Sequence, residues 1–227
     1  MADIDFFRAL SAKYGLPLQF VIKEFYVMDL LEKIVTKLQD EIIIFKGGTA
    51  LNRVYTSGIS RFSEDLDFDY IAKKSAKEKI KFLDNVMKIE GYTIETSRLF
   101  RNRLRFDCSF RNEMGKKDVV RAEFNLSFSK PIGEVEKKSV VSGISGKTIV
   151  GVNVYSLEGL LAGKILALHN RTEGKDIFDL ANFIQKSNLK LLVKVLEAVL
   201  RYEKGTKRAK DVINECIEKL DAINIKE

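Results

Sequence analysis

One short stretch of alternating residues constrains the fold of this chain more than any other feature. From position 65 to position 69 the sequence reads Asp-Leu-Asp-Phe-Asp. Successive side chains of a strand point to opposite faces of a sheet, so this order predicts a strand with Asp65, Asp67 and Asp69 on one face and two apolar side chains in the core. Carboxylates this close repel one another, and a divalent cation removes that cost. The stretch therefore indicates a metal-binding strand.

A glycine pair precedes this strand. Gly47-Gly48-Thr49 follows an apolar run at positions 42–45 and comes before an expected helix over 50–55. The free backbone N–H groups and the hydroxyl at such a helix start can hold a phosphate. A glycine pair alone is most often only a turn, and Asp-x-Asp alone is most often solvated surface or a helix cap. Together they are more specific, because a separation of 16 positions between Thr49 and Asp65 leaves room for one helix and the return into a strand.

The combination resembles the minimal site of the DNA polymerase β-like nucleotidyltransferases, a Gly-Gly or Gly-Ser turn followed by Asp-x-Asp. Within that superfamily, Gly-Gly-Thr-Ala-Leu at 47–51 and Arg-Phe-Ser-Glu-Asp-Leu-Asp-Phe at 61–68 are similar to the AbiEii/AbiGii toxin family, the abortive-infection nucleotidyltransferases of bacteria and archaea. The resemblance implies an α/β (α+β) fold, with a mixed sheet, flanking helices and a C-terminal helical part.

The same resemblance implies a reaction. A nucleoside monophosphate would pass from a nucleoside triphosphate to an acceptor hydroxyl, with loss of pyrophosphate. Asp65 and Asp67 would bind Mg²⁺ or Mn²⁺. The β- and γ-phosphates would be held by Gly47, Gly48 and either Thr49 or Ser63. By family analogy the acceptor would be RNA, such as a tRNA 3′ end, and the chain would be a growth-arresting toxin with an antitoxin protein encoded nearby.

A third acidic residue, Glu123, lies in a later strand pattern. Apolar and polar residues alternate over 103–110 and again over 120–128, with a hairpin turn expected at 112–116. Sites of the superfamily use a third carboxylate from a neighbouring strand, and Glu123 has the matching position. It would complete the metal shell or take the proton of the attacking hydroxyl. The alternative is a cross-strand salt bridge with Arg103 or Arg105.

Arginines recur near this strand, at positions 101, 103 and 105. Two interpretations remain open. The row is either a patch that faces a triphosphate or RNA, or an exposed strand face protected by charge.

The pattern becomes helical from Ser156 onward, which can cap a helix. We therefore expect a nucleotidyltransferase α/β domain over 1–155 and a helical domain over 156–227, packed together across a soft boundary near Tyr155. The last two helices are expected at 189–202 and 209–223. The segment 130–150 matches no motif.

The helical part contains a second group of charged residues. In the AbiEii/AbiGii family that the chain resembles, the signature is completed by charged residues after the sheet. They are a lysine, then an arginine, then Arg/Lys-Asp with a further aspartate three residues on. Lys164, Arg171, Lys175, Asp176 and Asp179 match it, except that lysine stands at 175 where arginine is frequent. The resemblance places Lys164 and Asp176 in the catalytic cleft. Lys164 lies in an apolar helix and needs a partner, either a phosphate or Asp176. The alternatives are a lysine at a helix rim and an aspartate that caps a helix.

Composition agrees with these expectations. The net charge of +7 favours a polyanionic partner, although solvated lysine-rich helices explain part of it. Cys108 and Cys216 lie in apolar patterns, which indicates reduced core thiols. The single histidine, His169, excludes multi-histidine metal sites. With no span-length apolar run and no signal-peptide pattern, we expect a cytoplasmic protein with no membrane partner.

Two other classes of function fit the same residues. One is a nucleotidyltransferase that modifies a small molecule or a protein side chain. The other is a nonenzymatic module that binds nucleotide or RNA. The intact pair Asp65 and Asp67 argues against the nonenzymatic module.

Overall fold

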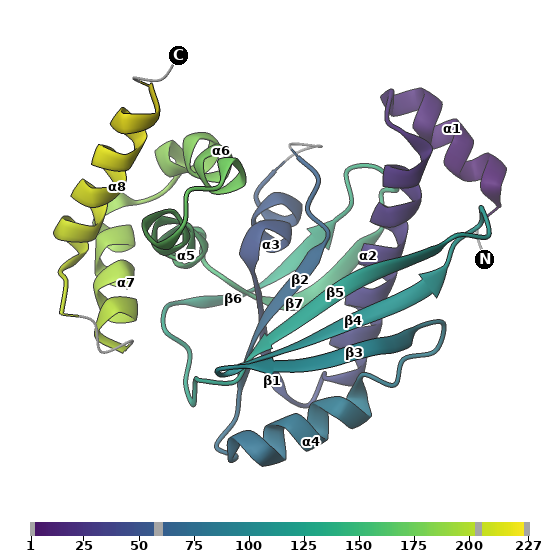
Figure 1. Cartoon of the computed structure of the whole chain (residues 1–227), viewed down its shortest axis with the longest axis horizontal. Coiled ribbons are helices and arrows are strands. Elements are labelled where there is room, and N and C mark those ends of the chain that lie inside the picture. The colour runs from purple at the N-terminus through teal and green to yellow at the C-terminus, as the bar shows by residue number, and fades with distance from the viewer. Residues whose placement is uncertain (1–2, 57–60, 203–205, 225–227) are drawn as a thin grey trace. The chain divides into compact units, whose positions relative to one another are not determined.

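The structure, a computed structural model, describes residues 3–56, 61–202 and 206–224. The chain divides into two compact units (Figure 1). The first unit comprises residues 1–130 and 136–154, and the second comprises residues 131–135 and 155–227. A mixed sheet with helices makes up the first unit and helices dominate the second, which confirms the expected mixed α/β class.

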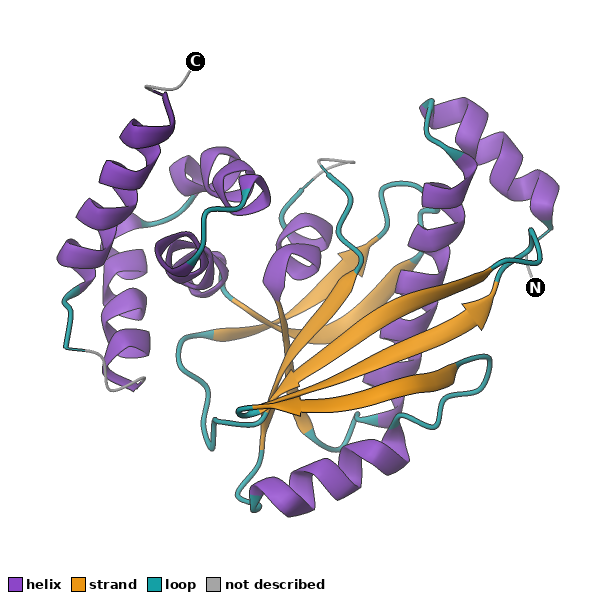
Figure 2. Ribbon diagram, in the orientation of Figure 1, coloured by secondary structure: helices purple, strands orange, loops and turns teal. Residues whose placement is uncertain are grey.

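The described residues form a seven-stranded sheet with the order β3-β4-β5-β2-β1-β7-β6 (Figure 2). Strand β2 runs antiparallel to β1 and parallel to β5, so the acidic strand lies between the strand that precedes the glycine motif and the strand that carries Glu123. β1 also runs parallel to β7, and β4 runs antiparallel to both β3 and β5. The strands are β1 (Ile42–Lys46), β2 (Asp65–Ile71), β3 (Thr93–Phe100), β4 (Arg103–Arg111), β5 (Lys117–Asn125), β6 (Val135–Val141) and β7 (Thr148–Tyr155).

The apolar side chains of the alternating strands form the core of the first unit. Phe68 of β2 lies 5.1 Å from Phe124 and 5.3 Å from Phe45, measured between ring centroids, and all three rings are fully buried. Burial of such rings is a large part of the hydrophobic stabilisation of a sheet. Helix α2 (Leu18–Lys37) crosses one face of the sheet (Figure 1), and its buried apolar residues include positions 27, 30, 31 and 34, the spacing of an amphipathic helix.

Three further helices belong to the first unit: α1 (Ile4–Tyr14), α3 (Gly47–Val54) and α4 (Ala76–Val86). The expected start of α3 at position 50 is wrong, because the helix begins at the glycine pair itself. Helix α4 begins directly after Ser75. Ser75 accepts a hydrogen bond from the backbone of Glu78, and Glu78 accepts one from the backbone of Ser75, so this capping box fixes its first turn.

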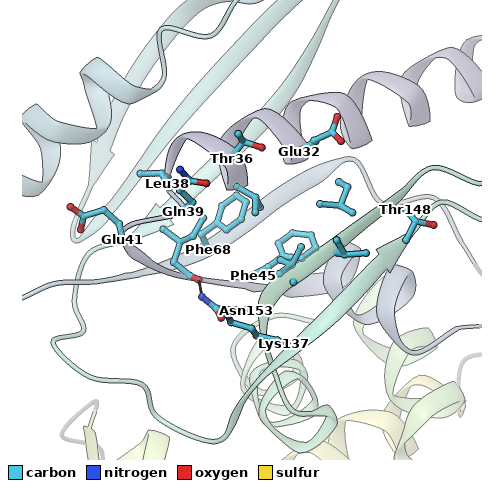
Figure 3. Close-up of a pocket in the computed structure, with 16 residues that line it drawn as sticks. Glu32, Thr36, Leu38, Gln39, Glu41, Phe45, Phe68, Lys137, Thr148 and Asn153 are labelled. Carbon is cyan, nitrogen blue, oxygen red and sulfur yellow. Dashed lines mark hydrogen bonds between the residues drawn. The ribbon is translucent and has the colours of Figure 1, made fainter.

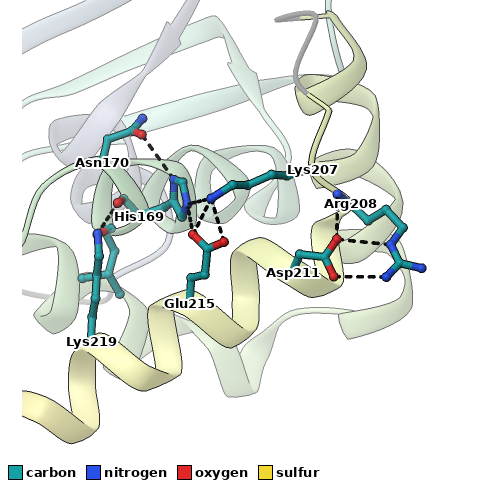
Figure 4. Close-up of polar contacts among 8 residues, drawn as sticks. His169, Asn170, Lys207, Arg208, Asp211, Glu215 and Lys219 are labelled. Carbon is teal, nitrogen blue, oxygen red and sulfur yellow. Dashed lines mark hydrogen bonds and ion pairs between the residues drawn. The ribbon is translucent and has the colours of Figure 1, made fainter.

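The helices of the second unit are α5 (Leu157–Asn170), α6 (Gly174–Phe183), α7 (Leu189–Tyr202) and α8 (Ala209–Asn224), with a short 3-10 turn at Ile184–Lys186. Helix α8 is tied to α5 by polar contacts (Figure 4). Nε2 of His169 lies 2.6 Å from Glu215, and Lys219 donates to the carbonyl oxygen of His169. Glu215 also accepts from Lys207 at 2.6 Å. None of the described helices has the length and apolar character needed to cross a lipid bilayer.

The two cysteines are free and buried, as the sequence predicts. Cys108 lies in β4 and Cys216 in α8, where its thiol lies 3.6 Å from the carbonyl oxygen of Ile165.

Candidate active site

Gly47 joins the glycine motif to the acidic strand. Lys46, the last residue of β1, pairs with Asp67 of β2, so helix α3 begins against the middle of β2. Gly47 has a φ of 78°, a conformation that side chains strongly disfavour. A Cβ atom on Gly47 would lie 3.0 Å from Cβ of Asp67 and would overlap its carboxylate. The sequence therefore has glycine here because the helix start approaches Asp67 too closely for any other residue.

The three aspartates of β2 have different surroundings. Asp65 and Asp67 are half-buried, and Leu66 between them is fully buried, as the predicted alternation requires. Asp69 is buried, and its carboxylate lies 2.5 Å from Nζ of Lys46 and accepts a hydrogen bond from Asn125 at 3.0 Å. The accessible carboxylates are therefore those of Asp65 and Asp67, whereas Asp69 belongs to an internal ion pair.

Glu123 lies on the strand next to the aspartates. It pairs in register with Asp67 across the parallel strands β2 and β5, so the two side chains share one face of the sheet. Nη1 of Arg103 lies 3.5 Å from the Glu123 carboxylate, which is the expected salt-bridge alternative, and both side chains remain partly exposed. Arg105 pairs instead with Asp107, at 2.9 Å. Glu123 therefore adjoins Asp67 and also takes part in a surface ion pair.

Thr49 and Ser63 connect the helix start to the acidic strand. The hydroxyl of Thr49 is buried, lies 2.6 Å from the carbonyl oxygen of Asp65 and 2.8 Å from Oγ of Ser63. One hydroxyl has one proton, so Thr49 can donate to Asp65 while Ser63 donates to Thr49. This arrangement makes Thr49 a residue that positions Asp65.

A cation that the sequence analysis did not assign also lies at the helix start. The guanidinium of Arg61 lies directly against the Cα side of Gly48, where a Cβ atom would collide with it. Arginine there places positive charge beside the N-terminus of α3, an arrangement suited to phosphate. The signal was present, because Arg61 opens the second family motif at 61–68.

The carboxylates fit a magnesium ion that also binds substrate phosphates. Among the residues that the structure describes, no group of three or more His, Cys, Asp or Glu side chains is arranged to hold a metal. Mg²⁺ is usually bound through one or two carboxylates together with water and phosphate oxygens. Asp65 and Asp67 supply two hard oxygen ligands on one face, which is enough for that mode of binding.

The second predicted group of residues forms a buried ion cluster within the helical unit. Nζ of Lys164 lies 3.0 Å from Asp176 and 2.7 Å from Asp179, and both aspartate side chains are fully buried. Nε of Arg171 donates to Asp176 at 3.0 Å. Of the two expected partners of Lys164, a phosphate or Asp176, the structure shows Asp176. The alternatives of a lysine at a helix rim and of Asp176 as a helix cap are wrong, because Lys164 is buried and Glu173 has the cap position.

Charge pairing sets the ionisation of this cluster. Burial on its own raises the pKa of Asp176, but the hydrogen bonds from Lys164 and Arg171 outweigh burial and hold the pKa below its ordinary value. Asp176 is therefore a charged partner of Lys164 at neutral pH.

A cavity of about 410 Å³ lies on the other face of the sheet (Figure 3). Phe45 and Phe68 line it, together with residues of α2 and β7. In β2, Phe68 alternates with Asp67, so this cavity and the carboxylates are on opposite faces of the sheet. The cavity therefore takes no part in the chemistry of Asp65 and Asp67.

A mixed sheet in which a glycine helix start lies against an Asp-x-Asp strand is the arrangement that the resemblance to nucleotidyltransferases implies. Solved structures share the fold. The chain is similar to the MenT4 nucleotidyltransferase toxin of Mycobacterium tuberculosis, with a TM-score of 0.58, 17% identity, and coverage of 82% of this chain and 68% of that one. It is also similar to JHP933 of Helicobacter pylori, with a TM-score of 0.51, 19% identity, and coverage of 90% and 98%. Among curated protein sequences, none matches.

The family model for the nucleotidyl transferase AbiEii toxin of type IV toxin-antitoxin systems matches residues 29–226. The chain belongs to this family, and the expected family and enzyme class are confirmed. Membership implies a nucleotide substrate and an antitoxin partner.

Proposed function

We propose that this nucleotidyltransferase transfers a nucleoside monophosphate from a nucleoside triphosphate to a hydroxyl of RNA, such as a tRNA 3′ end, with release of pyrophosphate, and that it does so with Mg²⁺ or Mn²⁺. The observation that carries the proposal is the contact of the α3 start at Gly47 with Asp67. This contact places the phosphate-binding helix start next to a carboxylate that can bind a cation. A triphosphate with a bound metal requires both in one place.

Each residue of the first unit has a role in this proposal. Backbone N–H groups of Gly47 and Gly48 donate to phosphate oxygens, and Arg61 neutralises phosphate charge. Thr49 and Ser63 hold the helix start on β2, and Ser63 also adjoins Gly48, its Oγ lying 3.2 Å from the position of a Cβ there. Asp65 and Asp67 would hold the metal, which when bound would neutralise charge on the triphosphate and polarise the phosphorus–oxygen bonds of the α-phosphate.

Glu123 completes the proposed chemistry as the base. A hydroxyl that attacks phosphorus loses its proton, and a carboxylate in register with Asp67 is suited to accept it. The same position allows Glu123 to act as a third metal ligand. Participation of Lys164 and Asp176 in the cleft stays a prediction, and the described contacts give these residues a structural role in the helical unit.

The choice of RNA as acceptor is supported by charge. The chain has a formal net charge of +7, and arginines lie beside Glu123 on the same face as the carboxylates. Repeated arginines next to the site would attract a polyanionic acceptor. A small cationic acceptor would require an acidic surface there.

The experiment is incubation of the purified chain with each α-labelled nucleoside triphosphate, Mg²⁺ and total cellular RNA, followed by a denaturing gel. We expect label in RNA, a requirement for divalent metal, and loss of label with Asp67→Asn, which removes one ligand charge without opening a cavity. Label on protein or on a small molecule would contradict RNA as acceptor. Full activity of Asp67→Asn or activity in excess EDTA would contradict the metal mechanism.

A further inference from the structure

The hairpin between β3 and β4 presents an aromatic ring to solvent. Phe100, the last residue of β3, is 71% exposed. The guanidinium of Arg101 lies 5.5 Å from the centre of the Phe100 ring. The backbone N–H of Leu126 donates to the carbonyl oxygen of Asn102 at 2.8 Å, which ties the turn to the end of β5. The ring therefore projects from an anchored turn.

Strand register places this ring on the same face as the candidate active site. Phe100 pairs with Arg103 and Arg98 pairs with Arg105, so their side chains share a face of β3 and β4. Arg105 pairs in turn with Glu123, and Glu123 pairs with Asp67. One face thus runs from the carboxylates of β2 across β5 and β4 to the hairpin. Three strand spacings separate β2 from β3, a distance of about 14 Å.

The arginines on this face are not equally neutralised. Arg103, Arg105 and Arg121 each lie near a carboxylate. Within the described part of the chain, neither Arg98 nor Arg101 forms an ion pair, and both are exposed. The uncompensated positive charge therefore lies on either side of Phe100.

The backbone of the turn is strained at an arginine. Arg101 has a φ of 54° and is the one residue other than glycine with a positive φ among those described. That conformation costs about 1–2 kcal/mol for most side chains and nothing for glycine. The turn geometry alone would favour glycine or asparagine, so the arginine is best explained by what its side chain does.

We propose that Arg98, Phe100, Arg101 and Arg103 form a platform, here called the β3–β4 platform, that binds the single-stranded end of the RNA acceptor. An exposed ring stacks on an unpaired base, and flanking arginines bind phosphates, which is how proteins hold single strands without reading their sequence. A few nucleotides span the distance from the platform to Asp67. The inference rests on the proposed function in taking RNA as the acceptor.

Binding of RNA is the direct test, measured without nucleoside triphosphate. The probe is a fluorescein-labelled adenosine oligonucleotide of about 12 nucleotides, and its anisotropy is followed on titration with the full chain. Phe100→Ala is expected to weaken RNA binding about fivefold to 100-fold relative to the parent, whereas Phe100→Tyr, which keeps an aromatic ring, should bind as the parent does. Val150→Ala is the matched control, because Val150 is 74% exposed on β7 and lies away from the platform; it should bind as the parent does.

The arginines are tested by salt dependence. Arg98→Gln and Arg101→Asn should each lower the slope of log affinity against log salt by about 0.7, the value for one phosphate contact on a single strand. Asparagine tolerates the positive φ at 101, so Arg101→Asn should keep or raise the melting temperature while it weakens binding. Loss of binding together with loss of folded protein would contradict this expectation.

Several results would overturn the inference. The first is absence of RNA binding by the parent chain, and the second is unchanged RNA binding by Phe100→Ala. The third is a Phe100→Ala variant that loses binding to an antitoxin protein and keeps binding to RNA. The proposed function fails separately. If RNA binding depends on Phe100 but no label is transferred, RNA is not the acceptor and the platform stands. If label is transferred to RNA and Phe100→Ala leaves the KM for RNA unchanged, the platform alone is contradicted.

Discussion

Gly47 links two requirements at the scale of a single residue. Its positive φ and its closeness to Asp67 both exclude a side chain. We expect Gly47→Ala to destabilise the fold by about 1–3 kcal/mol and to abolish transfer, because either the helix start or Asp67 has to move. Denaturant unfolding and the labelled-nucleotide assay measure the two effects.

Gly163→Ala is the control for this prediction. Gly163 lies within α5 and nothing lies within 4 Å of the position of an added Cβ atom. Alanine should stabilise that helix by about 0.5–1 kcal/mol. If Gly47→Ala kept full activity, the close approach of the α3 start to Asp67 would not matter for catalysis.

Glu123 has two neighbours that suggest different roles, Asp67 in register and Arg103 by ion pairing. We expect Glu123→Gln to lower kcat more than tenfold, about 1.4 kcal/mol of barrier, while the fold stays intact. Arg103→Gln breaks the same salt bridge and leaves the carboxylate in place, so kcat at saturating RNA should change less than threefold, a bound of about 0.7 kcal/mol, while loss of a platform arginine raises KM for RNA. Equal, small effects of the two substitutions would show that Glu123 serves the salt bridge alone.

Sequence reasoning found the site residues whose positions follow from local periodicity. The alternation of Asp65, Leu66 and Asp67 needs no knowledge of neighbouring strands. The partner of Asp69 could not be found this way, because Lys46 reaches it through the register of β1 on β2. Long-range pairing also fixes the hydrogen bond from Thr49 to Asp65.

At the scale of elements, the ion cluster joins α5 to α6. Lys164→Met should destabilise the chain by about 3–5 kcal/mol, because Asp176 and Asp179 would both lose the buried ammonium that they share. The control is Lys175→Met, a half-exposed lysine of α6 paired with Glu173, which should change stability by less than about 1 kcal/mol. Thermal unfolding followed by circular dichroism compares the two. A Lys164→Met protein as stable as its parent would exclude a structural role for the cluster.

The same cluster predicts how acid affects the helical unit. The pKa of Asp176 is lower in the folded chain than in the unfolded one, so its charge stabilises the fold above the ordinary aspartate pKa of about 3.9. This contribution is lost as pH falls through the lower folded value. Asp176→Asn should therefore show a shallower loss of stability than the parent below about pH 4, measured by urea unfolding at a series of pH values. An identical pH dependence would contradict the assignment.

Element boundaries were predictable where a periodic pattern ends in a local signal. Helix α7 spans Leu189–Tyr202, the same bounds as its apolar pattern. The start of α3 was misplaced by three residues, because glycines normally end a helix and here begin one. Strand β6 lies in a segment whose glycines hide its period, and its place in the sheet comes from tertiary pairing.

At the scale of the whole molecule, Cys108 reports on global unfolding. Burial raises the pKa of its thiol to about 12, so at pH 8.5, roughly the pKa of a free thiol, it stays protonated and inaccessible. We expect iodoacetamide to leave Cys108 unmodified in the native chain and to modify it quickly in denaturant, with mass spectrometry as the measurement. Fast native modification would contradict the packing of β4.

The two units are interleaved along the chain. Residues 131–135 belong to the helical unit although the residues on both sides of them belong to the sheet unit. Within the helical unit, the backbone N–H of Ser156 donates to the carbonyl oxygen of Glu134 at 3.0 Å, and Gly133 lies close to Val195. The helical unit is therefore assembled from two separate pieces of the chain.

This interleaving matters if the chain is produced as two separate polypeptides. A split between positions 154 and 155 would give one polypeptide that keeps residues 131–135 and another that needs them to complete its packing. The two halves would therefore be expected to recognise each other when they are produced separately. A cut at that single peptide bond would leave the helical product dependent on residues 131–135, which the other product carries.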